Sequence, residues 1–214
     1  MIRSVRVGST LLGGGSIPVQ SMTTTKTSDV EKSVAQILSL QDAGCDIVRV
    51  AVADEEDALA LRAIKARVSA PVVADVHFSA KLAVLAVENG ADKLRINPGN
   101  IGGEAEIARV ADCVKAHRVP VRVGANTGSI EKEHFARYGR SAQALVESAL
   151  SNVAVLERHG VGDIVISVKA SDVPLTVEAY TLLRKRCDYP LHLGVTEAGT
   201  RGTGIVKSSV GIGS

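Results

Sequence analysis

Short apolar runs alternate with amphipathic segments along almost the whole chain. Several of the runs are dense in valine and isoleucine, as at residues 47–52 and 164–168. The segments between them carry apolar residues at helical spacing, as at Val30, Val34 and Ile37. This alternation predicts an α/β fold whose parallel strands are buried on both faces. The predicted strands begin near Val19, Ile47, Val72, Lys93, Val121, Asp163 and Leu191.

The junctions between predicted helices and strands repeat a short pattern. Residues 43–47, 89–93 and 160–164 each contain a glycine shortly before an aspartate. A glycine can end a helix in the left-handed conformation, and the aspartate then leads into the next strand. Residues 28–31, Ser-Asp-Val-Glu, match a capping box with Ser28 as the N-cap of the first helix. The pattern predicts a series of stacked βα units.

The number of units leaves two architectures open, a (β/α)8 barrel that is one unit short and an open doubly wound sheet. Polar residues follow nearly all the predicted strands, whereas an open sheet gathers its site at one switch point. The first strand also runs into residues 21–25, Ser-Met-Thr-Thr-Thr, and lacks a Gly-x-Gly-x-x-Gly turn. We therefore predict a TIM barrel over residues 18–214 that is truncated after about seven βα units, with a helix starting near Val206. Residues 1–17, with glycines at 13–15, are predicted to form an N-terminal β-hairpin.

Cations and amides recur where the predicted strands end. The clearest case is residues 94–100, Leu-Arg-Ile-Asn-Pro-Gly-Asn, where an apolar run stops at a Pro-Gly turn. In a barrel the carboxyl ends of the strands converge on one face, so these residues become neighbours. The convergent set is Arg49, Asp75, His77, Arg95, Asn97, Asn100, Arg122, Asn126, Lys169, His192, Thr196 and Glu197.

This convergent set predicts a pocket for an anion. Three arginines and a lysine cannot lie together at low energetic cost unless an anion neutralises them. The planar fork of arginine suits phosphate oxygens, and a diphosphate would occupy several forks. Residues 98–103 add backbone N–H groups before a helix, another arrangement that binds anions. A single arginine at a strand end is more often a solvated rim residue, and a single histidine is more often structural, so the prediction depends on the recurrence.

Lys169 supports a second chemistry. A desolvated lysine near the end of a sixth barrel strand could attack a carbonyl and form a Schiff base. Neighbouring cations would lower the pKa of such an amine, but they would equally suit phosphate binding. The residues alone favour neither reading.

The composition excludes several classes of protein. The 214 residues are 45% hydrophobic and 2% aromatic, with a net charge of +2, so we expect one globular domain and no nucleic-acid partner. No apolar stretch approaches the roughly 20 residues of a membrane span, and the N-terminus lacks a secretory signal. The three cysteines, Cys45, Cys113 and Cys187, are too scattered for a disulfide framework, a zinc site or an iron–sulfur cluster. The chain is therefore predicted to be cytoplasmic and to hold no metal by itself.

Six motifs follow one another in a fixed order over essentially the whole chain. They occupy residues 19–23, 74–78, 94–100, 121–129, 167–172 and 192–199, and Lys207-Ser208 closes the series. This set resembles the 4-hydroxy-3-methylbut-2-enyl diphosphate synthases of the non-mevalonate isoprenoid pathway. The resemblance implies reductive ring opening of 2-C-methyl-D-erythritol 2,4-cyclodiphosphate, with electrons from flavodoxin or ferredoxin passed through a [4Fe-4S] cluster. It also implies that Glu197 is the proton donor and that the diphosphate is bound by Arg49, His77, Arg95, Asn97, Arg122, Asn126, Lys169 and Lys207.

The chain departs from the family in two respects. The eighth strand and the C-terminal domain, whose three cysteines and one glutamate hold the cluster in the family, are absent from these 214 residues. The resemblance further implies a head-to-tail homodimer in which one subunit's cluster domain covers the other's barrel. We expect this chain to supply the substrate-binding barrel. The alternatives are an isolated diphosphate-binding fragment without activity and a Schiff-base lyase that uses Lys169.

Overall fold

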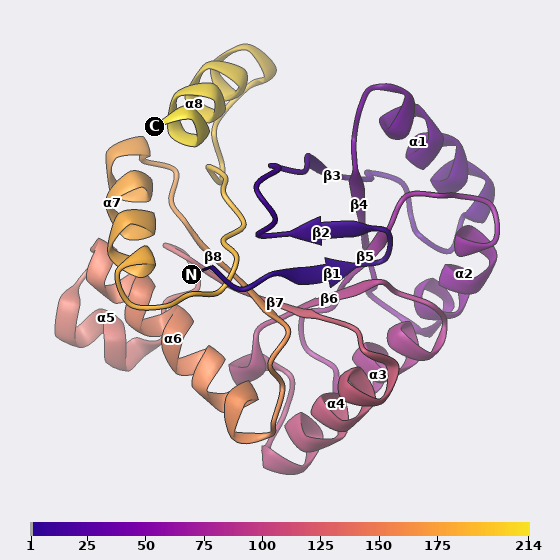
Figure 1. Cartoon of the computed structure of the whole chain (residues 1–214), viewed down its shortest axis with the longest axis horizontal. Helices are drawn as coiled ribbons and strands as arrows, with labels where there is room; N and C mark the ends of the chain where they lie inside the picture. Colours follow the sequence, from indigo (N-terminus) through magenta and orange to yellow (C-terminus); the bar gives the residue numbers. More distant parts are fainter. Residues whose placement is uncertain (1) are drawn as a thin grey trace.

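A curled parallel sheet carries most of the polar residues singled out in the sequence. The computed structural model describes residues 2–214, and the sheet curves around the centre of the molecule with the helices outside it (Figure 1). Each of the six strands pairs in parallel with the next strand along the chain, as expected of stacked βα units. They are β3 (Gln20–Met22), β4 (Ile47–Ala51), β5 (Val72–Asp75), β6 (Lys93–Ile96), β7 (Val121–Asn126) and β8 (Ile164–Lys169). The barrel fold predicted from the sequence is confirmed.

Most of the helices begin after an N-cap residue with a polar side chain. The N-cap residues of α1, α2, α3, α6 and α7 are Asp or Ser, and each accepts a hydrogen bond from the backbone N–H three residues later. The predicted capping box is wrong, because Asp29, and not Ser28, is the N-cap of α1, and the Glu31 carboxylate binds Arg67. No helix within residues 2–214 has the length and apolarity to cross a membrane. The helices are α1 (Val30–Asp42), α2 (Glu55–Lys65), α3 (Ala80–Glu88), η1 (Pro98–Asn100), α4 (Glu104–His117), α5 (Lys132–Tyr138), α6 (Ala142–Arg158), α7 (Val173–Arg184) and α8 (Arg201–Gly213).

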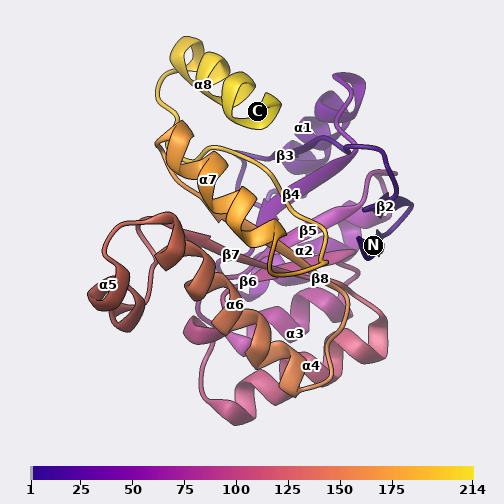
Figure 2. The same cartoon turned by 60° about the vertical axis from the view of Figure 1, so that its left-hand side comes forward.

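The seventh predicted strand is reduced to one residue. Leu191 forms a single parallel bridge with Ile166 of β8, through hydrogen bonds at Pro190 and His192. Pro190 lacks an N–H, so the segment can donate to the sheet only from His192 onward. The last helix, α8, starts at Arg201, earlier than the predicted start near Val206, and packs beside α7 (Figure 2).

The two faces of the sheet differ in chemistry. On the outer face, Val48, Val50, Val72 and other apolar residues of the strands form the main core with the helices. Side chains alternate between faces, so the residues between them point into the barrel. The predicted burial on both faces is confirmed for β5, β7 and β8, but the inner face is filled mainly by polar side chains. The inner positions include Gln20, Arg49, Asp75, Lys93, Arg95, Arg122, Ser167 and Lys169.

A hairpin closes the amino-terminal end of this interior. Its strands, β1 (Val5–Val7) and β2 (Thr10–Leu12), pair antiparallel and lie across the middle of the ring in Figure 1. Val7 and Leu12 pack against Ile47 and Val73, the lowest inward residues of β4 and β5. The predicted hairpin is confirmed, but its turn lies at residues 8–9 and not at the three glycines. The domain boundary at residue 17 stays a prediction.

The hairpin contact yields a stability prediction. Replacing the fully buried Val7 with alanine should lower the free energy of unfolding by about 1–3 kcal/mol, because it leaves a cavity at the barrel floor. The neighbouring Arg6 is exposed, so Arg6→Ala should change stability by less than about 0.5 kcal/mol. Urea unfolding of both variants measures the difference. Equal stabilities for the two would show that the hairpin does not contribute to the core.

Candidate functional site

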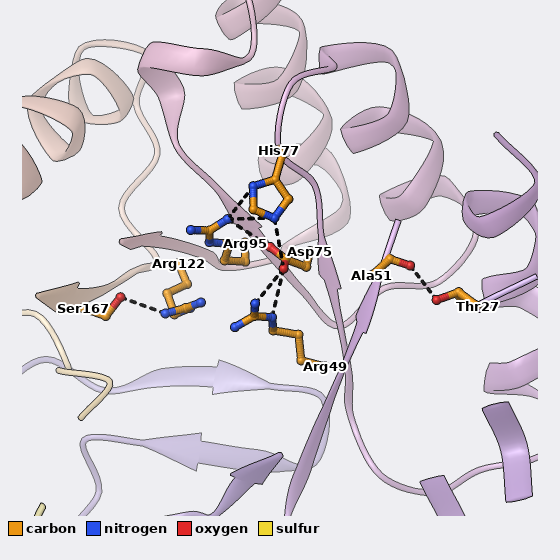
Figure 3. Close-up of polar contacts among 8 residues, drawn as sticks. All are labelled: Thr27, Arg49, Ala51, Asp75, His77, Arg95, Arg122 and Ser167. Carbon is orange, nitrogen blue, oxygen red and sulfur yellow. Dashed lines mark hydrogen bonds and ion pairs between the residues drawn. The ribbon is translucent and has the colours of Figure 1, made fainter. Parts of the chain in front are cut away.

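One buried carboxylate holds two arginines at the inner face of the sheet (Figure 3). Asp75 is the last residue of β5 and is 2% exposed. Its Oδ2 accepts hydrogen bonds from Nε and Nη2 of Arg49 on β4, at 3.1 and 2.7 Å. Its Oδ1 accepts one from Nη1 of Arg95 on β6, at 3.2 Å. Burial opposes ionisation of Asp75, but the charges of Arg49 and Arg95 outweigh it and lower the pKa of the carboxyl group.

His77 lies over this cluster, on the loop after β5. Its Nε2 is 3.4 Å from Oδ2 of Asp75, and both ring nitrogens lie 3.2–3.3 Å from Nη1 of Arg95. Arginine can only donate, so a ring nitrogen that binds Arg95 must be an acceptor. The His77 side chain is 54% exposed. It therefore lies at the solvent-facing side of the cluster, where a ligand would enter.

Arg122 lies deeper, on β7, and has no carboxylate partner among the described residues. It is 3% exposed, and its Nη1 donates to Oγ of Ser167 on β8 at 2.7 Å. The Nε atoms of Arg122 and Arg95 are both buried without a hydrogen-bond partner in the described part of the chain. Burial and the charges of Arg49 and Arg95 lower the pKa of Arg122 to about 9. A buried cation with an unpaired donor costs free energy. A bound anion would neutralise the charge and accept the unpaired hydrogen bond.

Two lysines extend the positive charge below and beside Arg122. Lys93, at the start of β6, is 1% exposed and donates to Oε1 of Gln20 on β3 at 3.0 Å. Lys169 ends β8. Burial, followed by the charges of Arg122 and Arg49, lowers the pKa of each lysine to about 7. The inner face thus gathers five basic side chains, and the ion pairs within residues 2–214 supply them with one carboxylate, Asp75.

His192 belongs to the same cluster. Burial, and then the charges of Arg122, Lys169, Lys93 and Arg49, lower the pKa of its imidazole, so the ring is neutral at pH 7. The backbone of His192 is fixed by its N–H, which donates to Ile166 at 2.8 Å, and by its carbonyl, which accepts from the Tyr180 hydroxyl. A neutral imidazole can donate a hydrogen bond to a ligand without adding a further charge.

The predicted asparagines lie at the rim and brace loops. Oδ1 of Asn97 accepts from the Gly99 N–H at 3.1 Å and starts the short helix η1. Oδ1 of Asn126 accepts from the Gly128 N–H at 2.9 Å. Asn126 is also the register partner of Lys169 across β7 and β8, which places it beside the cation cluster. Asn100, at the end of η1, is exposed.

Glu197 and Lys207 lie on the segment after β8. Glu197 is exposed and has a left-handed backbone, with φ of 49°, a conformation that costs free energy for a residue other than glycine. The preceding residue, Thr196, anchors this loop through its N–H to the Ala170 carbonyl at 3.1 Å. Nζ of Lys207 on α8 donates to the Ser171 carbonyl at 3.3 Å. Within residues 2–214 neither Glu197 nor Lys207 forms an ion pair with the cluster around Asp75, and their predicted roles stay predictions.

Sequence reasoning missed two inner residues, Lys93 and Gln20, and considered Ser167 only as a neighbour of Lys169 that could assist a Schiff base. Lys93 and Ser167 lie at strand positions that alternate with outward apolar residues, as Lys93 and Arg95 flank Leu94, whereas Gln20 has no such signal. This alternation of inward and outward positions is the sequence signal that could have identified them. Gly124 of β7 shows how full the interior is, because a Cβ built there would lie 2.8 Å from Oγ of Ser167.

The chain is similar to known proteins over its full length. The family described as the GcpE TIM-barrel domain matches residues 2–214. The 4-hydroxy-3-methylbut-2-en-1-yl diphosphate synthase (flavodoxin) of Caldanaerobacter subterraneus subsp. tengcongensis is 52% identical over 216 residues, which is 100% of this chain and 61% of that protein. The protein of the same name from Desulfotalea psychrophila is 53% identical, with 99% of this chain and 59% of that protein covered. The chain thus spans about three fifths of the length of these curated relatives.

Solved structures of other proteins share the fold alone. The truncated 3-deoxy-D-arabino-heptulosonate 7-phosphate synthase of Thermotoga maritima gives a TM-score of 0.72 at 15% identity, covering 99% of this chain and 77% of that one. The type I 3-dehydroquinate dehydratase of Clostridium difficile gives 0.68 at 16% identity, covering 97% and 84%. At these identities the likeness supports the barrel architecture and nothing about chemistry.

The carboxylate at the centre of the cluster yields a pH-dependent prediction. Asp75→Asn should lower the free energy of unfolding by about 3 kcal/mol at pH 7, because it leaves Arg49 and Arg95 without a counter-charge. The pKa of Asp75 is lower in the folded chain, so its stabilisation is complete above the unfolded pKa and is lost as pH falls through the folded pKa.

The difference between wild type and Asp75→Asn should therefore shrink as the pH is lowered below about 4. Asp112→Asn, at an exposed position on α4, is the matched control and should have little effect. Urea unfolding at several pH values measures both. A destabilisation by Asp75→Asn that stayed constant down to pH 2 would contradict the ionic role of this residue.

Proposed function

The chain belongs to the GcpE family, and we propose that its cation cluster binds 2-C-methyl-D-erythritol 2,4-cyclodiphosphate as the substrate barrel of a 4-hydroxy-3-methylbut-2-enyl diphosphate synthase. The single observation that carries the proposal is the charge imbalance inside the barrel. Five basic side chains converge there with one carboxylate, and two buried arginine Nε donors have no partner among the described residues. A diphosphate supplies two adjacent negative groups, which would balance the excess positive charge. Its several acceptor oxygens would bind the unpaired Nε donors.

The proposed binding roles follow from the depth of each residue. Arg49, Arg95 and Arg122 present guanidinium groups from three strands, and Lys169 adds an ammonium from a fourth. His77 lies at the open side of the cluster. Asn97 after β6, Asn126 at the end of β7 and Lys207 on α8 are proposed to contact the substrate from the rim. Glu197, on its strained loop, is proposed as the proton donor.

The proposed reaction is a two-electron reduction. The cyclic diphosphate dianion takes up two electrons and one proton. One C–O bond to phosphate breaks and leaves its oxygen as an anion on the phosphate, one hydroxyl leaves with the proton as water, and a carbon–carbon double bond forms. The product is 4-hydroxy-3-methylbut-2-enyl diphosphate. The chain's own contribution is to hold the diphosphate in place while its bond to carbon is cleaved and to deliver a proton from Glu197. Bound phosphate oxygens held by buried arginines also stabilise the charge that the phosphate gains as the ring opens.

The described residues do not fit an iron–sulfur cluster. The cysteines Cys45, Cys113 and Cys187 are free and lie on separate elements, and no group of three His, Cys, Asp or Glu side chains within residues 2–214 could hold a metal. We therefore propose that the [4Fe-4S] cluster of the family reaction is bound by other residues than these. The electron donor is proposed to be flavodoxin, as in the names of the relatives, and the working assembly a cytoplasmic homodimer. The chain alone should bind substrate without turnover.

The lowered pKa of Lys169 would also suit a Schiff-base amine, the alternative raised by the sequence. The arginines around it favour the diphosphate, because a carbonyl substrate would leave Arg122 without an anion and Asp75 as the one counter-charge for Arg49 and Arg95.

Removal of single arginines tests the pocket assignment. Arg95→Ala and Arg122→Ala should each weaken binding of the cyclodiphosphate by about 2–4 kcal/mol, or roughly 30- to 700-fold, because each removes a charged donor and leaves phosphate oxygens unpaired. Titration calorimetry with the purified chain gives the affinities.

Arg109→Ala is the matched control, because Arg109 is exposed on the outer helix α4. The Arg109→Ala variant should bind the cyclodiphosphate with the affinity of the wild type. Arg122→Lys distinguishes charge from geometry and should retain part of the affinity, since lysine keeps the charge and loses the fork. Unchanged affinity in both alanine variants would rule out the proposed pocket.

A further inference from the structure

Lys93 occupies the floor of the pocket, below the residues proposed to touch the diphosphate. It lies two positions before Arg95 on β6, so both side chains point into the barrel. Its hydrogen bond to Gln20 joins β6 to β3, and β4 and β5 lie between these strands in the sheet. The contact therefore crosses the interior. The apolar layer of Val7, Leu12, Ile47 and Val73 adjoins this contact, because Val73 of β5 is the register partner of Lys93.

The hydrogen-bond partner of Lys93 does not determine its charge. An amide oxygen accepts a hydrogen bond from an ammonium and from a neutral amine alike. A carboxylate partner would instead hold the lysine in its charged form. Among the described residues Lys93 forms no ion pair, and Asp75 on the adjacent β5 is already engaged by Arg49 and Arg95.

The charged and titratable groups around Lys93 are mostly positive. Arg49 on β4, Arg122 on β7 and Lys169 on β8 face the same interior, and the neutral ring of His192 lies in the same field. Asp75 is the one negative group among them. Burial of Lys93, which is 1% exposed, and then the charges of Arg122 and Arg49 lower its pKa to about 7, so the side chain is only partly charged near neutral pH.

We infer that Lys93 takes up a proton from solvent when the doubly charged cyclic diphosphate enters the pocket, and releases it when the ligand leaves. The inference rests on the proposed function, because it needs an anion above the floor. Two negative charges would reverse the field that the arginines impose on Lys93 and favour its ammonium form. Without ligand, a neutral Lys93 would reduce the repulsion among the basic side chains. With the diphosphate bound, the protonated Lys93 would add a positive charge that attracts it.

The ligand itself simplifies the proton count. In a cyclic diphosphate each phosphorus keeps one strongly acidic oxygen and none that titrates near neutral pH. Any proton taken up on binding at pH 8 must therefore be bound by the protein and not by the ligand. Lys169 has a similarly lowered pKa, so it should take up a proton as well, and the two lysines must be separated by substitution.

Calorimetric titration with 2-C-methyl-D-erythritol 2,4-cyclodiphosphate at pH 8, in two buffers of different ionisation enthalpy, measures the protons taken up. The wild-type chain should take up about two, one at each lysine, because amines with a pKa near 7 are mostly neutral at pH 8 before the ligand binds. Lys93→Met should take up about one proton fewer. Lys93→Arg should also lose this proton while retaining affinity, since arginine stays charged throughout. Lys132→Met, at an exposed position on α5, is the control and should behave as wild type.

The outcomes separate the two proposals. Binding without proton uptake by the wild type would overturn the role of Lys93 and leave the proposed function standing. The same holds if Lys93→Met and Lys93→Arg take up as many protons as the wild type. A wild-type chain that does not bind the ligand would overturn both proposals. If Lys93→Met fails to fold, Lys93→Arg and the wild-type proton count decide the matter.

Discussion

The pairing of Asp75 with Arg49 and Arg95 is the interaction on which the rest of the site depends. A single carboxylate, 2% exposed, aligns two guanidinium groups from the neighbouring strands β4 and β6. It neutralises part of their charge, but Arg122, Lys93 and Lys169 remain without a carboxylate among the residues described. The carboxylate makes the cluster stable enough to fold, and the remaining positive charge makes it a site for a dianion.

The barrel makes this arrangement possible by assigning the two faces of each strand to different tasks. Outward residues such as Val48 and Leu94 supply the apolar core with the helices, so inward positions are free to be polar. The hairpin residues Val7 and Leu12 seal the floor against water. The charges therefore lie in a partly desolvated interior, where an anion is bound more strongly than it would be at a surface.

The sequence predicted the fold and most of the site, since six strands lie where apolar runs occur and Arg49, Arg95 and Arg122 converge as expected. It placed a full strand at Leu191, where one bridge forms, because the lack of a donor at Pro190 was not weighed. Lys93 was not predicted because it begins its strand, whereas the predicted site residues follow strand ends; alternation along the strand decides which side chains enter the barrel. The Gln20 contact depends on the curvature of the sheet, which local sequence does not encode.

A crystal structure of the chain with 2-C-methyl-D-erythritol 2,4-cyclodiphosphate tests the central claim most directly. The account predicts both phosphate groups inside the barrel, with their oxygens hydrogen-bonded to Arg95 and Arg122 and satisfying at least one of the two buried Nε donors. Density for the ligand outside the barrel, with Arg122 still bound only to Ser167, would contradict it.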